Sequence, residues 1–139
     1  MKKIKFNKLV PELSVVDIEK SKLFYINVLG FVLEYERHQD KFVYLSYFGS
    51  QIMLEQINKN WNTGALEYPF GRGINFQIET TEIYELEKRL KNNGVKIYKP
   101  IFESDYKVNN ITYTEIQLLV QDPDGYLLRF SQTKKQTTK

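Results

Sequence analysis

The 139-residue sequence contains no cysteine, so disulfide bonds, thiolate metal sites and a cysteine nucleophile are all excluded. It contains one histidine, His38, so the commonest catalytic base and metal ligand is absent from every other position. No long apolar run occurs, and the start MKKIKFNKLV lacks the apolar segment of a signal peptide. The sequence therefore predicts a soluble cytoplasmic protein with no membrane partner.

The positive charge of the chain is concentrated at its two ends. The formal net charge is +3 and the isoelectric point is about 8.9. The terminal lysines are Lys2, Lys3, Lys5, Lys134, Lys135 and Lys139. Without these six, residues 6–133 carry 14 basic and 17 acidic side chains. No basic stripe with interleaved aromatic residues occurs between them, so nucleic acid is not an expected partner. Both basic ends are predicted to be frayed.

Alternation and helical periodicity predict the same order of elements in both halves of the chain. In the first half, Asp17 is a helix N-cap and Gly30 is the stop signal. In the second half, Thr80 or Thr81 caps the helix and Asn93-Gly94 ends it. The predicted strands are 9–15, 31–36, 42–48 and 51–57, then 73–79, 95–99, 111–120 and 126–131. Residues 58–72 and 101–110 are the longest irregular stretches, which often carry binding groups.

The order is therefore βαβββ twice, which predicts an α+β fold. We expect a single domain, 1–139, made of one module at 8–57 and another at 73–132. Residues 58–72 form the linker, and 133–139 form a basic tail. The two modules are predicted to form a curled mixed-sheet cleft with the helices outside, so that polar strand positions face the cleft.

Four segments resemble the vicinal oxygen chelate superfamily, which includes glyoxalase I, extradiol dioxygenases, fosfomycin resistance enzymes and bleomycin resistance proteins. They are LSVVDIEKSKLFYINVLGF (13–31), QIMLEQ (51–56), GRGINFQIE (71–79) and DPDGYLLRF (122–130). In the enzymes of this superfamily, four strand residues bind a divalent metal, as His or Gln, Glu, His and Glu. The matching positions in this chain are Val10, Glu55, Gly73 (Ile74 if the register slips by one) and Arg129.

Three of these four positions depart from the metal-binding pattern. Val10 and Gly73 have no side-chain donor, and Arg129 is a permanent cation that would repel a metal ion. Glu12, Glu55 and Glu115 are conceivable as an alternative set of metal ligands, but their spacing in the sequence does not support such a site. His38, in ERHQDKF, is predicted to be a solvated turn residue. The sequence therefore predicts no metal and no other cofactor.

The pseudo-symmetry between the modules relates Glu55 to Arg129. One hypothesis is that the two side chains pair with each other in place of the metal, because an unpaired buried charge costs several kcal/mol. The other is that Arg129 contacts a ligand carboxylate or phosphate while Glu55 contacts an amine. The two hypotheses do not exclude each other.

The predicted site is the polar wall of the cleft, which binds a ligand. It has no catalytic residues, because the sequence shows no nucleophile with a neighbouring base. Trp61, in the crossover loop, is either a lid or a packing plug, and Tyr44 or Tyr47 adds an aromatic wall. Strand alternation also places Met53 on the cleft side. The predicted ligand-binding residues are Glu12, Ser14, Glu55, Trp61, Phe70, Asn75, Gln77 and Arg129.

Within the superfamily, MLEQ and the arginine of the DPDG strand are most similar to the bleomycin resistance branch. The resemblance implies a homodimer that binds and sequesters a small molecule, such as the antibiotic bleomycin, without a metal. The alternative is a metal-dependent lyase, isomerase or dioxygenase with non-standard ligands. A third hypothesis is a structural or regulatory module whose cleft is filled by its own side chains.

Overall fold

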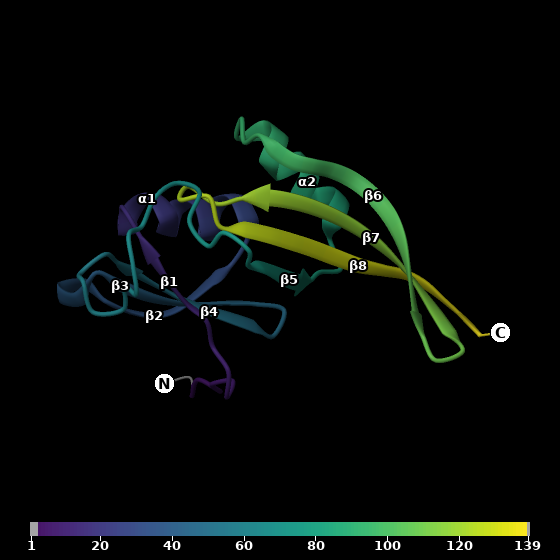
Figure 1. Cartoon of the computed structure of the whole chain (residues 1–139), viewed down its shortest axis with the longest axis horizontal. Helices are drawn as coiled ribbons and strands as arrows, with labels where there is room; N and C mark the ends of the chain where they lie inside the picture. The colour runs from purple at the N-terminus through teal and green to yellow at the C-terminus, as the bar shows by residue number, and fades with distance from the viewer. Residues whose placement is uncertain (1–2, 139) are drawn as a thin grey trace. The chain divides into compact units, whose positions relative to one another are not determined.

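Each half of the chain folds as a strand, a helical segment and three further strands (Figure 1). The computed structural model describes residues 3–138 and divides into two compact units, Met1–Phe70 and Gly71–Lys139. The first unit contains β1 (Glu12–Val15), α1 (Ile18–Leu23), η1 (Phe24–Leu29), β2 (Val32–Arg37), η2 (His38–Asp40), β3 (Phe42–Tyr47) and β4 (Ser50–Gln56). The second contains β5 (Asn75–Glu79), α2 (Ile83–Asn92), β6 (Ile97–Val108), β7 (Ile111–Gln121) and β8 (Leu127–Thr138).

The two units have the same sheet topology. Their strand orders are β1-β4-β3-β2 and β5-β8-β7-β6. In the first sheet β1 pairs in parallel with β4, and in the second β5 pairs in parallel with β8. The other neighbouring strands are antiparallel. These two mixed sheets with few helices confirm the predicted α+β class and the repeated βαβββ order.

The first helical segment begins and ends where the sequence predicts. The Asp17 carboxylate accepts hydrogen bonds from the backbone N–H groups of Glu19 (3.1 Å) and Lys20 (3.3 Å). The segment continues through η1 and ends at Gly30, whose φ of 92° is a left-handed conformation that glycine adopts without strain. Because this helix is short, its position depends on the apolar residues that it buries against the sheet.

In each unit the apolar side of the sheet packs beneath the helix. In the first unit, Leu13, Val15 and Leu54 are buried. In the second unit, α2 contributes the fully buried Ile83, Leu86 and Leu90, and the sheet contributes Leu118, Val120, Leu128 and Phe130. The opposite side of each sheet is therefore the side available for a site.

The largest departures from the prediction in the second unit are at residues 101–108 and 133–138. Residues 101–108 belong to β6, so the expected irregular stretch reduces to the turn at Asn109–Asn110 of the β6–β7 hairpin. The basic end is not frayed over 133–138, because β8 continues to Thr138, which lies opposite Ile111. Backbone pairing with β7 holds this polar segment, although it has no apolar alternation. Lys139 lies outside the described residues.

The N-terminal end differs from the prediction in a smaller way. The first strand begins at Glu12 and not at residue 9, and the side chain of Leu9 is 86% exposed. Lys5 and Asn7 are held by hydrogen bonds with Gln51 of the strand β4. Lys2 lies outside the described residues. Within residues 3–138, no helix has the length and apolar character needed to cross a membrane.

Candidate functional site

The open side of the first sheet combines aromatic rings with carboxylates. The parallel register places Glu12 opposite Met53 and Ser14 opposite Glu55. On the neighbouring strand, Tyr44 lies opposite Met53 and Phe42 opposite Glu55. Because directly paired residues point to the same side of a sheet, these side chains share one face. We call this the aromatic face; it comprises Glu12, Ser14, Tyr35, Phe42, Tyr44, Met53 and Glu55.

Three rings pack against one another on the aromatic face. Tyr35 and Tyr44 are stacked with centroids 5.3 Å apart, and Tyr35 and Phe42 are 5.7 Å apart. Phe6 and Tyr44 pack in a T-shaped arrangement with ring centroids 5.2 Å apart. Of the two tyrosines left open by the sequence, Tyr44 therefore belongs to this face, whereas Tyr47 stacks on Phe31 on the core side.

Arg37 supplies a cation to the aromatic face. Its guanidinium carbon lies 4.0 Å from the centroid of the Phe42 ring, a cation–π contact. A hydrogen bond to Asp40 (2.9 Å) fixes the guanidinium and raises the pKa of Arg37, so this residue remains charged. The sequence prediction missed this contact, although the alternation of strand 42–48 puts Phe42 on the side of Tyr44.

Hydrogen bonds of Gln51 connect the N-terminal residues 5–7 to the aromatic face. Its amide oxygen accepts hydrogen bonds from the Tyr44 hydroxyl and from the Asn7 N–H, and its amide nitrogen donates to the Lys5 carbonyl oxygen. Burial, together with the neighbouring Tyr35 and Glu34, raises the pKa of Tyr44. Tyr44 is therefore a neutral hydrogen-bond donor at physiological pH.

The two carboxylates of the face have different surroundings. Burial, and secondarily the charge of Glu55, raises the pKa of Glu12, while Arg37 acts in the opposite direction. Glu55 accepts hydrogen bonds from the Asn58 amide (2.9 Å) and the Trp61 indole N–H (3.2 Å). Trp61 is 67% exposed, whereas Phe70 is buried.

The open side of the second sheet carries the other predicted residues. Gln77 lies opposite Arg129 in the parallel pair of β5 and β8, and Asn75 is two residues before it on the same side. Arg129 Nε donates a hydrogen bond to Asn75 Oδ1 at 3.0 Å. We call this the polar face; its polar residues are Asn75, Gln77, Gln117, Arg129 and Ser131.

A hydrogen-bond chain centred on the buried Gln117 extends across the polar face. The Tyr106 hydroxyl donates to Gln117 Oε1 (2.8 Å), Gln117 Nε2 donates to Ser131 Oγ (3.1 Å), and Ser131 donates to Glu115 (2.8 Å). Gln117 is only 1% exposed. The prediction missed this chain, although Glu115 and Gln117 alternate with apolar residues in the strand 111–120.

The side chains at the four superfamily positions do not fit a divalent metal. Val10 and Gly73 offer no donor, and Arg129 is a cation bonded to Asn75. Within residues 3–138, no group of three or more His, Asp or Glu side chains is placed to hold a metal ion. Glu55 belongs to the first unit and Arg129 to the second, so their pairing stays a prediction.

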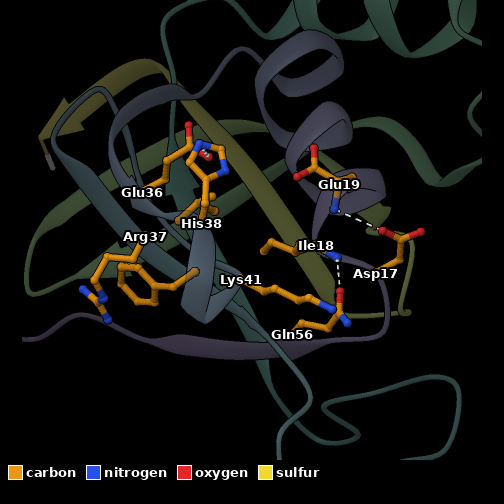
Figure 2. A pocket seen from close by; sticks show the side chains of 10 residues that line it. Asp17, Ile18, Glu19, Glu36, Arg37, His38, Lys41 and Gln56 are labelled. Carbon is orange, nitrogen blue, oxygen red and sulfur yellow. Dashed lines mark hydrogen bonds and ion pairs between the residues drawn. The ribbon is translucent and has the colours of Figure 1, made fainter.

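One pocket of about 330 Å³ lies where α1 begins, beside the ends of β2 and β4 (Figure 2). Gln56 Oε1 accepts a hydrogen bond from the Ile18 N–H there, at 3.1 Å. Glu36 is 2.8 Å from Lys22 Nζ, and this hydrogen bond lowers the pKa of Glu36. His38 also lines this pocket, and its side chain is 77% exposed, as expected for a turn residue. None of the predicted ligand-binding residues lines this pocket.

A second pocket of about 530 Å³ adjoins the aromatic face through Glu55. We call it the amide pocket; it is lined by Gln39, Gln56, Asn58 and Asn60, with Asp40, Lys41, Glu55 and Ile57. Of the predicted ligand-binding residues, Glu55 lines it directly, and Trp61 is hydrogen-bonded to Glu55.

Comparison with known proteins gives a consistent family assignment. The family model of the Glyoxalase/Bleomycin resistance protein/Dioxygenase superfamily matches residues 5–130. A curated relative, lactoylglutathione lyase from Neisseria meningitidis serogroup A, is 27% identical over 127 residues. These cover 88% of this chain and 87% of that protein.

Two solved structures extend the comparison. A member of the same superfamily from Vibrio splendidus 12B01 is 39% identical, covering 87% of this chain and 94% of that one, with a TM-score of 0.40. The genomically encoded fosfomycin resistance protein FosX from Listeria monocytogenes is 21% identical over 91% of both chains, with a TM-score of 0.60. The likeness to the latter shows a shared fold.

Proposed function

Because the chain belongs to the glyoxalase/bleomycin resistance protein/dioxygenase superfamily, we propose that it binds and sequesters a small molecule without a metal. An antibiotic such as bleomycin is the ligand class that the sequence resemblance suggests. The observation that carries the proposal is the aromatic face, where stacked rings adjoin two carboxylates. Within the described part of the chain, neither Glu12 nor Glu55 has a salt-bridge partner.

The chemistry of the two faces suits different parts of such a ligand. The partly exposed ring of Tyr35, which stacks on the buried Tyr44, provides an apolar surface, and the carboxylates of Glu12 and Glu55 favour positively charged groups. On the polar face, Arg129 favours a carboxylate or phosphate. We assign ligand contacts to Glu12, Ser14, Glu55, Trp61, Phe70, Asn75, Gln77 and Arg129, and we propose a cytoplasmic homodimer.

Calorimetric titration with bleomycin tests the role of Glu55. The substitution Glu55→Gln removes the charge but keeps the shape, so we expect an affinity loss of about tenfold, the effect of weakening one charge-assisted contact. The melting temperature should change little. The control is Glu85→Gln, which removes the same charge from an exposed position of α2. Unchanged affinity in Glu55→Gln would exclude Glu55 from the site.

The substitution Arg129→Leu separates the two hypotheses for the arginine. If Arg129 contacts the ligand, the affinity falls about tenfold or more. If it pairs with Glu55, the stability effects of Arg129→Leu and Glu55→Gln are non-additive in a double-mutant cycle measured by urea denaturation. If neither affinity nor stability changes, the position has no role in either.

The second candidate is a metal-dependent lyase, isomerase or dioxygenase. The observation that favours it is the Neisseria relative, named lactoylglutathione lyase, which matches nearly the whole chain. Titration of nickel, zinc, manganese and ferrous iron into the protein distinguishes the candidates. Tight one-to-one binding supports the enzyme, and the absence of binding supports metal-free sequestration.

A further inference from the structure

The amide pocket has an unusual composition for a small-molecule site. Half of the residues that line it are amides: Gln39, Gln56, Asn58 and Asn60. A primary amide carries two donor hydrogens and one acceptor oxygen, so it can both donate to and accept from the same partner. A hydroxyl group has the same dual capacity. The pocket is therefore suited to a ligand that carries several hydroxyl groups.

Several of these hydrogen-bonding groups are available to a ligand. Within residues 3–138, no hydrogen bond involves the side chains of Gln39 or Asn60. Gln56 uses its oxygen to accept from Ile18, which leaves its NH₂ group as a donor. Glu55 accepts both of its hydrogen bonds through Oε1, so Oε2 remains an acceptor. Donors and acceptors are thus present together on the pocket wall.

The charges of the pocket are nearly balanced. Lys41 is the only cation among its lining residues, and Asp40 and Glu55 are the anions. Asp40 is already paired with Arg37 at 2.9 Å. The pocket therefore has neither the cluster of cations that binds a phosphate nor a strong excess of negative charge for an amine. A neutral polar group meets no electrostatic penalty there.

An exposed indole completes the arrangement. Trp61 is 67% exposed, and its ring is anchored by the hydrogen bond from Nε1 to Glu55 at 3.2 Å. An indole that is bonded at its edge presents an apolar face to its surroundings. A pyranose ring has one side made largely of C–H groups, which packs on such a face while its hydroxyls reach polar partners.

We propose that the amide pocket is a carbohydrate subsite, which binds a neutral pyranose ring through the amides of Gln39 and Asn60 and through the exposed face of Trp61, which is hydrogen-bonded to the pocket residue Glu55. The inference deepens the proposed function and rests on it, since Glu55 belongs to both sites. It names the glycosyl part of a ligand whose other groups contact the aromatic face. The pocket volume of about 530 Å³ is sufficient for one or two sugar rings.

The fluorescence of Trp61 provides a direct assay, because it is the only tryptophan in the chain. The probes are methyl β-D-glucopyranoside and cellobiose, with glycerol as a polyol that lacks a ring. We expect a saturable emission change with a dissociation constant of about 1–10 mM for the sugars, and a shift of the indole N–H signal in an NMR spectrum. A response no different from that of glycerol would overturn the inference.

Substitutions locate the binding. In an NMR titration, Gln39→Ala and Asn60→Ala should each weaken cellobiose binding about fivefold, the effect of one lost hydrogen bond. Gln136→Ala is the matched control, because it removes an exposed amide from β8 of the second unit and should change nothing. Equal affinity in all three variants would contradict a subsite in this pocket. Tetramethylammonium chloride tests the alternative of a cation site, and saturable binding of this salt in place of the sugars would also overturn the inference.

The outcomes separate this inference from the proposed function. If bleomycin binding depends on Glu55 but neither sugar binds, the sequestering function stands and the carbohydrate subsite fails. If cellobiose binds and depends on Gln39 while bleomycin does not bind, the subsite stands and the proposed ligand is wrong.

Discussion

The two sheets share one topology but differ in the chemistry of their open sides. Beneath the helices, both sheets present the same kind of aliphatic surface, such as Leu13 and Leu54 in the first and Leu118 and Leu128 in the second. On the open side, the first sheet has stacked rings, whereas the second has a hydrogen-bond chain whose central member, Gln117, is buried. The shared topology requires apolar residues where the sheet packs under a helix. It places no such requirement on the opposite side, so the residues there differ between the two units.

The two open sides also depend on different interactions. Contacts between rings on the aromatic face are large in area and only weakly directional. The chain from Tyr106 through Gln117 to Glu115 requires each partner at a defined distance and angle. We therefore expect truncation to be costly on the first face and the loss of polar groups to be costly on the second.

The largest effect is expected for Phe42→Ala. Phe42 is 2% exposed, packs against Tyr35 and lies beneath Arg37, so the substitution leaves a cavity and removes the cation–π contact. We expect a loss of about 3 kcal/mol in the free energy of unfolding, measured by urea denaturation. Phe48→Ala, at a 59% exposed position, is the control and should cost less than about 1 kcal/mol. Equal costs would show that the stacked rings do not stabilise the first unit.

A smaller effect is expected for Gln117→Leu on the polar face. Leucine fills a similar volume but removes the acceptor of the Tyr106 hydroxyl and the donor to Ser131, which keeps only its bond to Glu115; this should cost about 2 kcal/mol. A double-mutant cycle with Ser131→Ala, again in urea, should give a coupling energy of about 1 kcal/mol. Gln136→Leu, at an exposed position, is the control. A stabilising Gln117→Leu would mean that the chain adds no net stability.

The smallest effect is expected for Glu12→Gln and depends on pH. Because the pKa of Glu12 is raised above its ordinary value of 4.5, the folded state binds this proton more tightly than the unfolded state does. Wild-type stability should therefore fall as the pH rises from the ordinary pKa to the raised one. At neutral pH the variant should be more stable by less than about 1 kcal/mol, after allowance for solvent screening.

Thermal melting between pH 4 and pH 7 measures this difference. The advantage of Glu12→Gln should disappear as the pH is lowered and Glu12 of the wild type becomes protonated. A variant that is less stable than the wild type at neutral pH would instead indicate that the ionised carboxylate has a stabilising partner.

The fold was predictable where side chains alternate between a buried and an exposed side. Leu13 and Val15 alternate with Glu12 and Ser14, and both the strand and its orientation follow from that pattern. In β6 most side chains are exposed on both sides, so residues 101–108 show no alternation, and the sequence predicts a loop there. The extension of β8 is polar throughout, and only its pairing with β7 reveals it as a strand.

The candidate site was predictable in part for the same reason. Alternation identifies which residues share a face, such as Ser14 and Glu55, but it does not show which side chains touch. The contact of Arg37 with Phe42 and the bond from Trp61 to Glu55 depend on side-chain conformation. The amide pocket combines η2 with the segment after β4, and no local pattern brings Gln39 and Asn60 together.

The edge strand β6 has a consequence for the behaviour of the protein at high concentration. It is 12 residues long and lies at the end of its sheet, where unpaired backbone groups would recruit strands from other molecules and nucleate aggregates. Pro100 removes one backbone donor from this strand, and the charged side chains of Lys99, Glu103, Asp105 and Lys107 oppose close stacking. The polar residues that remove the alternating pattern from this strand are therefore the same residues that limit its self-association.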